Sequence, residues 1–290
     1  MQNREMLIRR ATLDDEADVF IWRNNPITRS MFFDEREVGR SIHNKWFIHV
    51  MQSKHQKLFI GVIEDCKIGA VRFDVDENTK KVEISINLNP DFRGKGLSKL
   101  LLASSILSFS PCAPVNFLAN IKPKNELSIK IFSALGFSVV SHAADNISLE
   151  YSYFPLTFNS VTLENAEILY TFLSNRRFNI SHNRLPSFEE HVLFIKNNPY
   201  QNWFLINSRE TIGSFYTQRD NSVGLDLPSS NLIDVLQVIK YLKDELVPEK
   251  EKPSQVPPYF FINVSCENDS LKRTLKELNL KPLQVSYKVL

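Results

Sequence analysis

Residues 82–98 read VEISINLNPDFRGKGLS, an alternating segment that runs into two closely spaced glycines and then into an apolar stretch. The alternation predicts a strand, and the apolar residues after the glycines predict a helix. Gly94 and Gly96 let a backbone loop approach a ligand closely, and the N–H groups of such a loop converge with the positive end of the helix. Arg93 and Lys95 add positive charge. The segment therefore predicts a cradle for phosphate oxygens, although a short glycine loop also fits a surface turn with two basic residues.

The first half of the chain predicts an α/β fold built around a mixed sheet. Hydrophobic periodicity and turn residues give the order strand, helix, helix, three strands, helix, strand, helix and two strands. The expected strands are 6–12, 57–64, 67–75, 80–88 and 115–121, and the expected helices are 13–24, 38–51, 97–109 and 125–135. Pro26 closes the first helix, and Gly136 stops the last one because glycine readily adopts the left-handed cap conformation. Two further strands end near residue 153.

Residues 154–290 repeat this order with weak identity, which predicts two domains, 1–153 and 154–290. Five residues near the end stand at one constant offset from five residues of the first half. They are Asn263, Asn268, Leu275, Leu278 and Leu280, which correspond to Asn120, Asn125, Phe132, Leu135 and Phe137. A chance match of common residues is the alternative, but a constant offset favours duplication.

Composition excludes several classes of protein. The net charge of the 290 residues is +2 and no run of lysine or arginine stands out, so nucleic acid is not an expected partner. The three cysteines show no C-x-x-C pair, and the histidines show no ligand spacing, so no metal site is expected. No stretch approaches the roughly 18 apolar residues of a membrane span, and the first residues lack a signal-peptide core. We expect a cytoplasmic protein that is a monomer or a homodimer.

The glycine loop resembles the acetyl-CoA pyrophosphate loop of the GNAT N-acetyltransferase superfamily, whose pattern is (Arg/Gln)-x-x-Gly-x-(Gly/Ala). Arg93 and Gly96 match that pattern, and Ser98 stands where glycine or alanine is usual. The element order of the first half is similar to that of the family, as is the block NELSIKIFSALGF at 125–137. The resemblance implies tandem GNAT-like acyl-CoA N-acyltransferase folds, with acetyl-CoA as donor.

The resemblance also implies how acetyl-CoA lies. In this family the fourth and fifth strands splay apart, and the pantetheine arm bonds to the exposed backbone of the fourth strand. Carried over to this chain, the cofactor contacts are Ile86, Leu88, Arg93, Gly94, Lys95, Gly96, Leu97, Ser98, Asn120, Asn125 and Phe132. Many relatives carry a tyrosine in the last helix that protonates the departing thiolate. Phe132 stands at that position and cannot donate a proton, so the thiolate would leave unaided or through water.

Glu83 is the predicted catalytic base. The amine must lose a proton when it attacks the thioester, and a positioned carboxylate can accept that proton. Strand alternation places Glu83 on one face with Ser85 and Asn87. Many relatives use a glutamate at the corresponding position, often through water. The alternative is a solvated strand glutamate opposite Lys80 or Lys81.

A second group of residues predicts the acceptor-binding wall. It contains Trp22, Arg23, Asn24, His43, Trp46 and Arg72. The Trp-Arg-Asn run, the His-x-x-Trp-Phe helix and the Ile-Gly-x-Val-Arg-Phe-Asp strand resemble the acetyltransferases of pseudaminic acid biosynthesis, which act on the 4-amino group of a nucleotide-linked amino sugar. Arg23 and Arg72 would then contact a nucleotide diphosphate. Both tryptophans also fit core positions.

The second half lacks the cradle. Its fourth strand, 222–227, passes through Pro228-Ser229-Ser230 into a helix over 231–242, and Ser222 falls where Glu83 would be. We expect Ser229 or Ser230 to cap that helix and the domain to be structural or acceptor-binding.

The leading hypothesis is acetylation of a primary amine, the small-molecule acceptor being a nucleotide amino sugar used for surface polysaccharide. The alternatives are a protein amino terminus or an aminoglycoside-like amine as acceptor, and a non-catalytic acyl-CoA-binding module.

Overall fold

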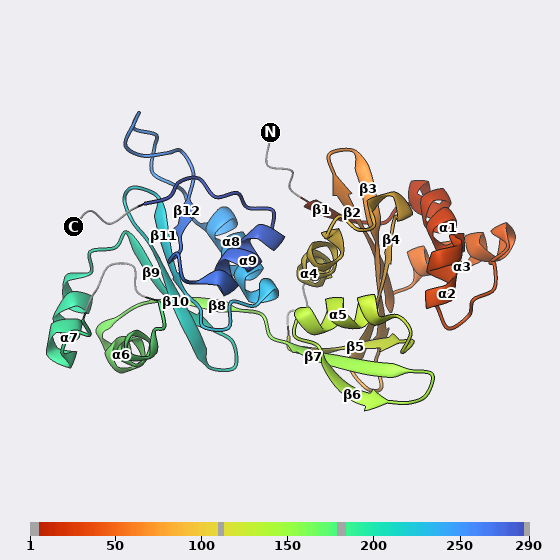
Figure 1. Cartoon of the computed structure of the whole chain (residues 1–290), viewed down its shortest axis with the longest axis horizontal. Coiled ribbons are helices and arrows are strands. Elements are labelled where there is room, and N and C mark those ends of the chain that lie inside the picture. Colours follow the sequence, from red (N-terminus) through yellow and green to blue (C-terminus); the bar gives the residue numbers. More distant parts are fainter. Residues whose placement is uncertain (1–5, 110–112, 179–183, 287–290) are drawn as a thin grey trace. The chain divides into compact units, whose positions relative to one another are not determined.

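The computed structural model describes residues 6–109, 113–178 and 184–286. The chain divides into two compact units, each built around its own sheet (Figure 1). One unit contains Met1–Phe154 with Lys276–Leu290, and the other contains Pro155–Leu275. In the described ranges no helix is both long and apolar enough to cross a membrane.

The first unit contains a seven-stranded sheet in the order β1-β2-β3-β4-β5-β7-β6. Its strands are β1 (Met6–Arg10), β2 (Gln56–Ile63), β3 (Cys66–Asp76), β4 (Lys81–Leu88), β5 (Val115–Ile121), β6 (Ser138–His142) and β7 (Ile147–Tyr153). Neighbouring strands are antiparallel except β4 and β5, which run parallel. This mixed sheet confirms the predicted fold class.

Helices cover both faces of this sheet (Figure 1). They are α1 (Glu16–Asn24), α2 (Pro26–Met31), α3 (Arg40–Gln52), α4 (Leu97–Phe109) and α5 (Glu126–Ala134). Apolar residues of α1 and α3 pack on one face, in a cluster of Val19, Trp22, Phe47, Val50, Leu58, Ile60 and Ala70. Strand residues alternate between faces, so Phe73 points to the other side, where its ring stacks on Phe109 of α4 at 4.6 Å.

Pro26 does not simply end the first helix, because a second short helix begins at that residue. Asn25 caps α2 by accepting a hydrogen bond from the Thr28 amide at 3.3 Å. Proline is well tolerated at the first helical position, where its missing N–H would have no partner in the helix. The sequence prediction of one helix closed by proline therefore missed α2.

The second unit repeats the order and direction of the first five strands. Its strands are β8 (Thr157–Ser160), β9 (Asn202–Asn207), β10 (Thr211–Thr217), β11 (Ser222–Asp226) and β12 (Phe261–Asn263), in the order β12-β11-β10-β9-β8. Its helices are α6 (Ala166–Asn175), α7 (Phe188–Asn197), α8 (Leu232–Glu245) and α9 (Asp269–Glu277), the last of which ends beyond the boundary of the unit. The β11–β12 pair is parallel and the others are antiparallel, as for β4 and β5 in the first unit.

The cap of α8 differs from the prediction. Asn231 accepts hydrogen bonds from the amides of Ile233 at 2.8 Å and Asp234 at 3.3 Å, so it caps the helix in place of Ser229 or Ser230. Ser230 instead donates its hydroxyl to the Leu227 carbonyl at 3.0 Å and adopts a positive φ of 44°. Asparagine and serine both cap helices well, so residue preference did not distinguish between them. The helix continues to Glu245, three residues beyond the predicted end.

Candidate active site

The sheet of the first unit opens between β4 and β5. The two strands pair from Lys81 with Asn116 to Glu83 with Leu118. Beyond that rung the described residues show no β4–β5 pairing, although β4 runs to Leu88 and continues to pair with β3. The backbone of β4 after Glu83 therefore lacks a strand on the β5 side. This is the splay that the resemblance implied, and it leaves Ile86 and Leu88 at the open edge.

The glycine loop connects this open edge to α4. Gly94 and Gly96 both have a φ of 73°, in the left-handed region that favours glycine. A Cβ atom at either position would meet nothing within 4 Å. The described residues supply no hydrogen-bond acceptor for the backbone N–H groups of Gly94, Lys95 or Gly96. These N–H groups precede Leu97, where α4 begins, so the loop and the N-terminus of the helix can bind an anion together.

Arg93 faces the corner between α1 and α2. Its Nη1 donates to Asn25 Oδ1 at 3.0 Å, and its Nη2 donates to the Thr28 hydroxyl. The guanidinium thus fastens the loop to the cap of α2. Lys95 lies over the Phe92 ring, with Nζ 4.4 Å from the ring centroid. The predicted phosphate contacts of Arg93 and Lys95 remain predictions.

Glu83 lies on the last paired rung before the splay. Its side chain is exposed, and directly opposite residues share a face, so it lies beside Asp74 of β3. Asp74 is already engaged, because Arg72 Nε donates to one oxygen at 2.8 Å and Gln56 Nε2 to the other at 2.6 Å. No hydrogen bond or ion pair of the described residues occupies the Glu83 carboxylate.

The alternative for Glu83 was a solvated strand glutamate opposite Lys80 or Lys81, and the exposed side chain fits that alternative as well as a catalytic role. Lys81 forms its ion pair with Glu150 of β7, not with Glu83. Lys80 has a φ of 54° in the turn before β4. The carboxylate of Glu83 is therefore available to a ligand or a water molecule.

The structure brings together only part of the predicted acceptor wall. Arg72 lies on the face that Glu83 occupies, and its guanidinium carbon is 5.8 Å from the centroid of the Trp46 ring. Trp22 is 4% exposed and belongs to the core cluster between α1, α3 and the sheet, so it is a packing residue. Of the two tryptophans, Trp46 remains a candidate for acceptor contact.

His43 also lies in the interior. It is 2% exposed, and its Nδ1 is 2.8 Å from a carboxylate oxygen of Glu16. Rings of Phe20 and Trp46 lie 5.2 Å from it. Burial lowers the pKa of the imidazole, although the hydrogen bond to Glu16 acts in the opposite direction. His43 thus packs against Trp46 in the interior and does not itself line an open surface.

Arg23 and Asn24 hold the loop after α2. Arg23 Nη2 donates to the Asp34 carbonyl at 2.8 Å, and its guanidinium lies 4.4 Å from the centroid of the Phe32 ring. Asn24 exchanges two hydrogen bonds of 2.9 Å with the backbone of Val38. These contacts explain Asn24 and part of Arg23 by loop packing, whereas Arg23 Nη1 is buried and has no hydrogen-bond partner among the described residues. The predicted contact of both residues with an acceptor stays a prediction.

The predicted contacts on the β5 side fall in different environments. Asn120 Oδ1 accepts from Ser148 Oγ at 2.8 Å, and Asn125 caps α5 by accepting from the Ser128 amide at 3.2 Å. Phe132 is 2% exposed, with its ring 4.9 Å from that of Phe137. Asn120 and Asn125 lie beside the splay, whereas Phe132 is a core residue that makes no open surface. Ser98 lies in the first turn of α4, next to Leu97.

One feature of the site was missed from sequence. Glu35, in the loop after α2, pairs with Lys122 at 2.6 Å and Lys124 at 2.8 Å, both in the loop after β5. These two lysines lower the pKa of the Glu35 carboxyl to about 2. The partners are far apart in the chain, and single charged residues at such separations carry no sequence signal. The contact joins the α2–α3 loop to the β5–α5 loop. Among the described residues there is no cluster of histidine, cysteine and acidic side chains that would bind a metal.

Part of the chain is similar to known proteins. Residues 5–138 match the family model of the acetyltransferase (GNAT) domain. Similar solved structures include a domain from Methanocaldococcus jannaschii DSM 2661, with 23% identity, a TM-score of 0.44, and coverage of 52% of this chain and 99% of that chain. Another is spermidine N-acetyltransferase from Vibrio cholerae in complex with CoA and spermine, with 15% identity, a TM-score of 0.46, and coverage of 51% and 95%. A third is yncA from Salmonella typhimurium with its cofactor acetyl-CoA, with 21% identity, a TM-score of 0.45, and coverage of 51% and 94%. A search of curated proteins found no match.

Residues 5–138 therefore carry an acetyltransferase domain of the GNAT type. The match covers less than half of the chain, and it supports the predicted acetyl-CoA-dependent N-acetyltransferase activity for that part.

Proposed function

We propose that the first unit transfers an acetyl group from acetyl-CoA to a primary amine carried by a nucleotide-linked amino sugar, with Glu83 as the base. The observation that carries this proposal is the position of Glu83. Its carboxylate lies at the last paired rung before the splay, free of ion pairs among the described residues. A ligand held along the open edge of β4 would present its reactive end near this rung.

The chemistry requires one proton transfer. The amine nitrogen forms a bond to the thioester carbonyl carbon, the carbon–sulfur bond breaks, and the amine proton passes to Glu83 directly or through water. The electron pair of the broken bond leaves on sulfur as a thiolate, which takes a proton from water. Phe132 is buried and has no hydroxyl, so it does not supply that proton.

Arg72 supports a nucleotide-linked amino sugar as the acceptor. A planar guanidinium suits the oxyanions of a nucleotide diphosphate, and Trp46 beside it offers an aromatic surface. In this arrangement Asp74 holds the guanidinium in position.

A cationic amine, such as a polyamine or an aminoglycoside, is the second candidate. It is favoured by the charges on the same face, where Asp74 neutralises Arg72 and the Glu83 carboxylate is left over. A cation would pair with that free carboxylate before losing its proton.

Thiol release from acetyl-CoA tests both candidates. We would assay the full chain with nucleotide-linked 4-amino sugars, spermine and peptide amines. Release with the amino sugars alone would support the proposal, and release with spermine alone would replace it with the second candidate. If no acceptor causes thiol release while acetyl-CoA still binds, both candidate acceptors are overturned and a non-catalytic acyl-CoA-binding module is favoured.

Glu83→Gln tests the base. We expect kcat to fall by about 100-fold or more, the usual contribution of a positioned base, while acetyl-CoA affinity changes less than about twofold. Glu164→Gln is the matched control, because Glu164 is an exposed glutamate of the second unit. An unchanged kcat for Glu83→Gln would refute the assignment.

A further inference from the structure

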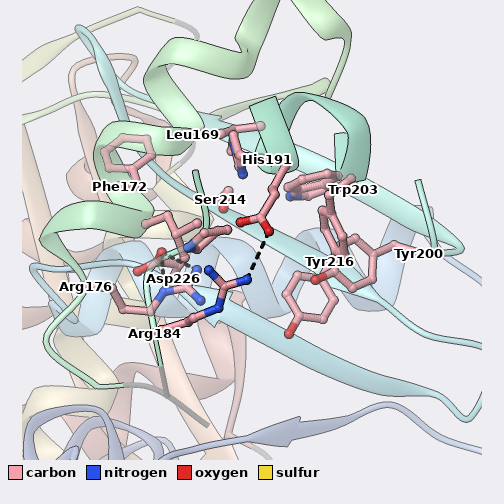
Figure 2. Close-up of a pocket in the computed structure, with 14 residues that line it drawn as sticks. Leu169, Phe172, Arg176, Arg184, His191, Tyr200, Trp203, Ser214, Tyr216 and Asp226 are labelled. Carbon is pink, nitrogen blue, oxygen red and sulfur yellow. Dashed lines mark hydrogen bonds and ion pairs between the residues drawn. The ribbon is translucent and has the colours of Figure 1, made fainter. Parts of the chain in front are cut away.

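The second unit contains a cavity of its own, of about 310 Å³ (Figure 2). Helices α6 and α7 form one side, and strands β9, β10 and β11 form the other. The volume lies at the lower end of the range for small-molecule sites. In the first unit the space between the corresponding helices and sheet holds the packed cluster that contains Trp22 and Phe47. The same fold can therefore fill this space with side chains, yet the second unit leaves part of it open.

The walls of the cavity are aromatic. Tyr200 and Tyr216 stack with ring centroids 3.8 Å apart, and Trp203 meets Tyr200 edge-on at 5.1 Å. Phe172 and Phe194 line other parts of the space. Burial and the neighbouring Tyr216 raise the pKa of the Tyr200 hydroxyl well above its usual value, so this hydroxyl stays uncharged. Such walls suit a flat ring that stacks on aromatic side chains.

Two arginines bring positive groups to the cavity, each held by an acid. Arg176 donates from Nε at 3.0 Å and from Nη2 at 2.7 Å to Asp226, and Arg184 Nη2 donates to Glu190 at 3.0 Å (Figure 2). Each guanidinium carries five N–H donors, so both retain donors beyond those pairs. The acids orient the arginines, and a phosphate or carboxylate fits the remaining donors. A cation would have to displace an arginine from its acid.

Two lining residues have buried nitrogen atoms without a partner among the described residues. They are Trp203 Nε1 and His191 Nε2, in side chains that are 8% and 6% exposed. Indole can only donate. Burial lowers the pKa of His191, although the backbone of Ala166 acts in the opposite direction. Both nitrogen atoms are closed to solvent, so a ligand in the cavity does not reach them in this arrangement, and the aromatic walls and the arginines define the chemistry of the site.

We propose that this cavity binds a small molecule that combines a planar aromatic ring with an oxyanion, a phosphate or a carboxylate. The ring stacks against the Tyr200–Tyr216 wall, and the oxyanion meets Arg184 and Arg176. Two sources fit this chemistry, a mononucleotide and an aromatic carboxylic acid. The inference does not depend on the function proposed for the first unit, because the second unit lacks the glycine loop and has Ser222 where Glu83 stands.

Calorimetric titration of the full chain without acetyl-CoA tests the proposal. The probes are UMP, uridine and phenylacetate. We expect UMP or phenylacetate to bind. If the ligand is a nucleotide, uridine should bind at least tenfold more weakly than UMP. Binding of UMP alone assigns a nucleotide, and binding of phenylacetate alone assigns an aromatic acid. Failure of both anions overturns the proposal.

Variants locate the site. Arg184→Ala should weaken binding about tenfold or more, the loss typical of a charge-assisted hydrogen bond, and its side chain is 78% exposed, so folding should not suffer. Arg219→Ala is the matched control, an exposed arginine in the turn after β10, and should change affinity less than twofold. Equal affinity of the Arg184→Ala variant and the wild type would overturn the assignment.

Tryptophan fluorescence gives a second readout. Trp203 is the single tryptophan of residues 155–275, since Trp22 and Trp46 lie in the first unit. Bound ligand should change the emission of the wild type, and Trp203→Phe should remove that change. A change that persists in Trp203→Phe would place the ligand elsewhere and refute the proposal. Neither measurement uses acetyl transfer, so failure here is distinct from failure of the proposed function.

Discussion

Alanine at Gly94 or Gly96 tests whether the loop after β4 holds phosphate by its backbone. Both glycines have a φ of 73°, and a Cβ atom would meet nothing within 4 Å. The free protein therefore has room for the methyl group, and the cost is the left-handed backbone itself. That cost is about 1–2 kcal/mol for an L-residue other than asparagine or aspartate. It lowers the fraction of correctly shaped loop roughly five- to thirtyfold, because 1.4 kcal/mol corresponds to a factor of ten.

The assay is calorimetric titration with acetyl-CoA, together with the KM for acetyl-CoA. We expect Gly94→Ala and Gly96→Ala each to weaken binding within that range, with kcat at saturating acetyl-CoA much less affected. Gly39→Ala is the control: Gly39 has a φ of −66° and a Cβ atom there would also meet nothing within 4 Å, so binding should not change.

Asparagine variants separate two reasons for a loss. Asparagine adopts the left-handed conformation more readily than alanine, so Gly96→Asn should regain binding if backbone conformation alone matters. If Gly96→Asn binds as poorly as Gly96→Ala, the phosphates come too close for any side chain. Affinities of both alanine variants within twofold of the wild type would refute the assignment of the loop to phosphate.

Three further predictions concern charge. Glu35→Gln should remove the ion pairs with Lys122 and Lys124 and speed amide hydrogen exchange in residues 34–39. The pKa of Glu35 in the folded protein is lowered to about 2, so the ion pairs are present at neutral pH and are lost only as the pH falls toward that value. The protection that these ion pairs give in the wild type should therefore persist between about pH 5 and pH 8. Burial lowers the pKa of His43, so its contribution to stability is present above the ordinary value of 6.5 and is lost as the pH falls below that value. His43→Gln should reduce the dependence of the free energy of unfolding on pH below 6.5, as measured by denaturant unfolding. The same pH dependence in the variant and the wild type would contradict the assignment. Burial raises the pKa of Asp234 to about 6 from 3.8, so stability is lost as the pH rises through 6. Asp234→Asn should therefore be more stable than the wild type by up to about 3 kcal/mol at pH 8, as measured by urea unfolding. At pH 4 the two proteins should have similar stability.

Local patterns predicted the framework of the first unit well. The alternation over 82–88 and the glycines after it depend on neighbouring residues, so the strand, the loop and the helix were all readable. The element α2 was missed because Pro26 fits the end of one helix and the start of another equally well. Ser229, Ser230 and Asn231 all suit the N-cap of α8, so residue preference alone did not identify Asn231 as the cap.

The site was less predictable because side-chain burial depends on the whole fold. Trp22 and Trp46 both suit a binding wall or a core, and only packing of α1 and α3 on the sheet buries the first and leaves the second beside Arg72. The availability of Glu83 depends on Lys81, which pairs with Glu150 on a strand that lies far along the chain.

The two units share the order of five strands but differ in how the chain leaves the fourth of them. Both keep the same strand order with one parallel pair at the same position. In the first unit the chain leaves β4 through two left-handed glycines, which expose backbone N–H groups. In the second it leaves β11 through Pro228 to the Asn231 cap, which uses the first amides of α8 internally. An anion at the start of α8 would therefore compete with a side chain already bonded there. The aromatic walls and paired arginines between α6, α7 and the sheet are the side chains that could hold a ligand of the second unit.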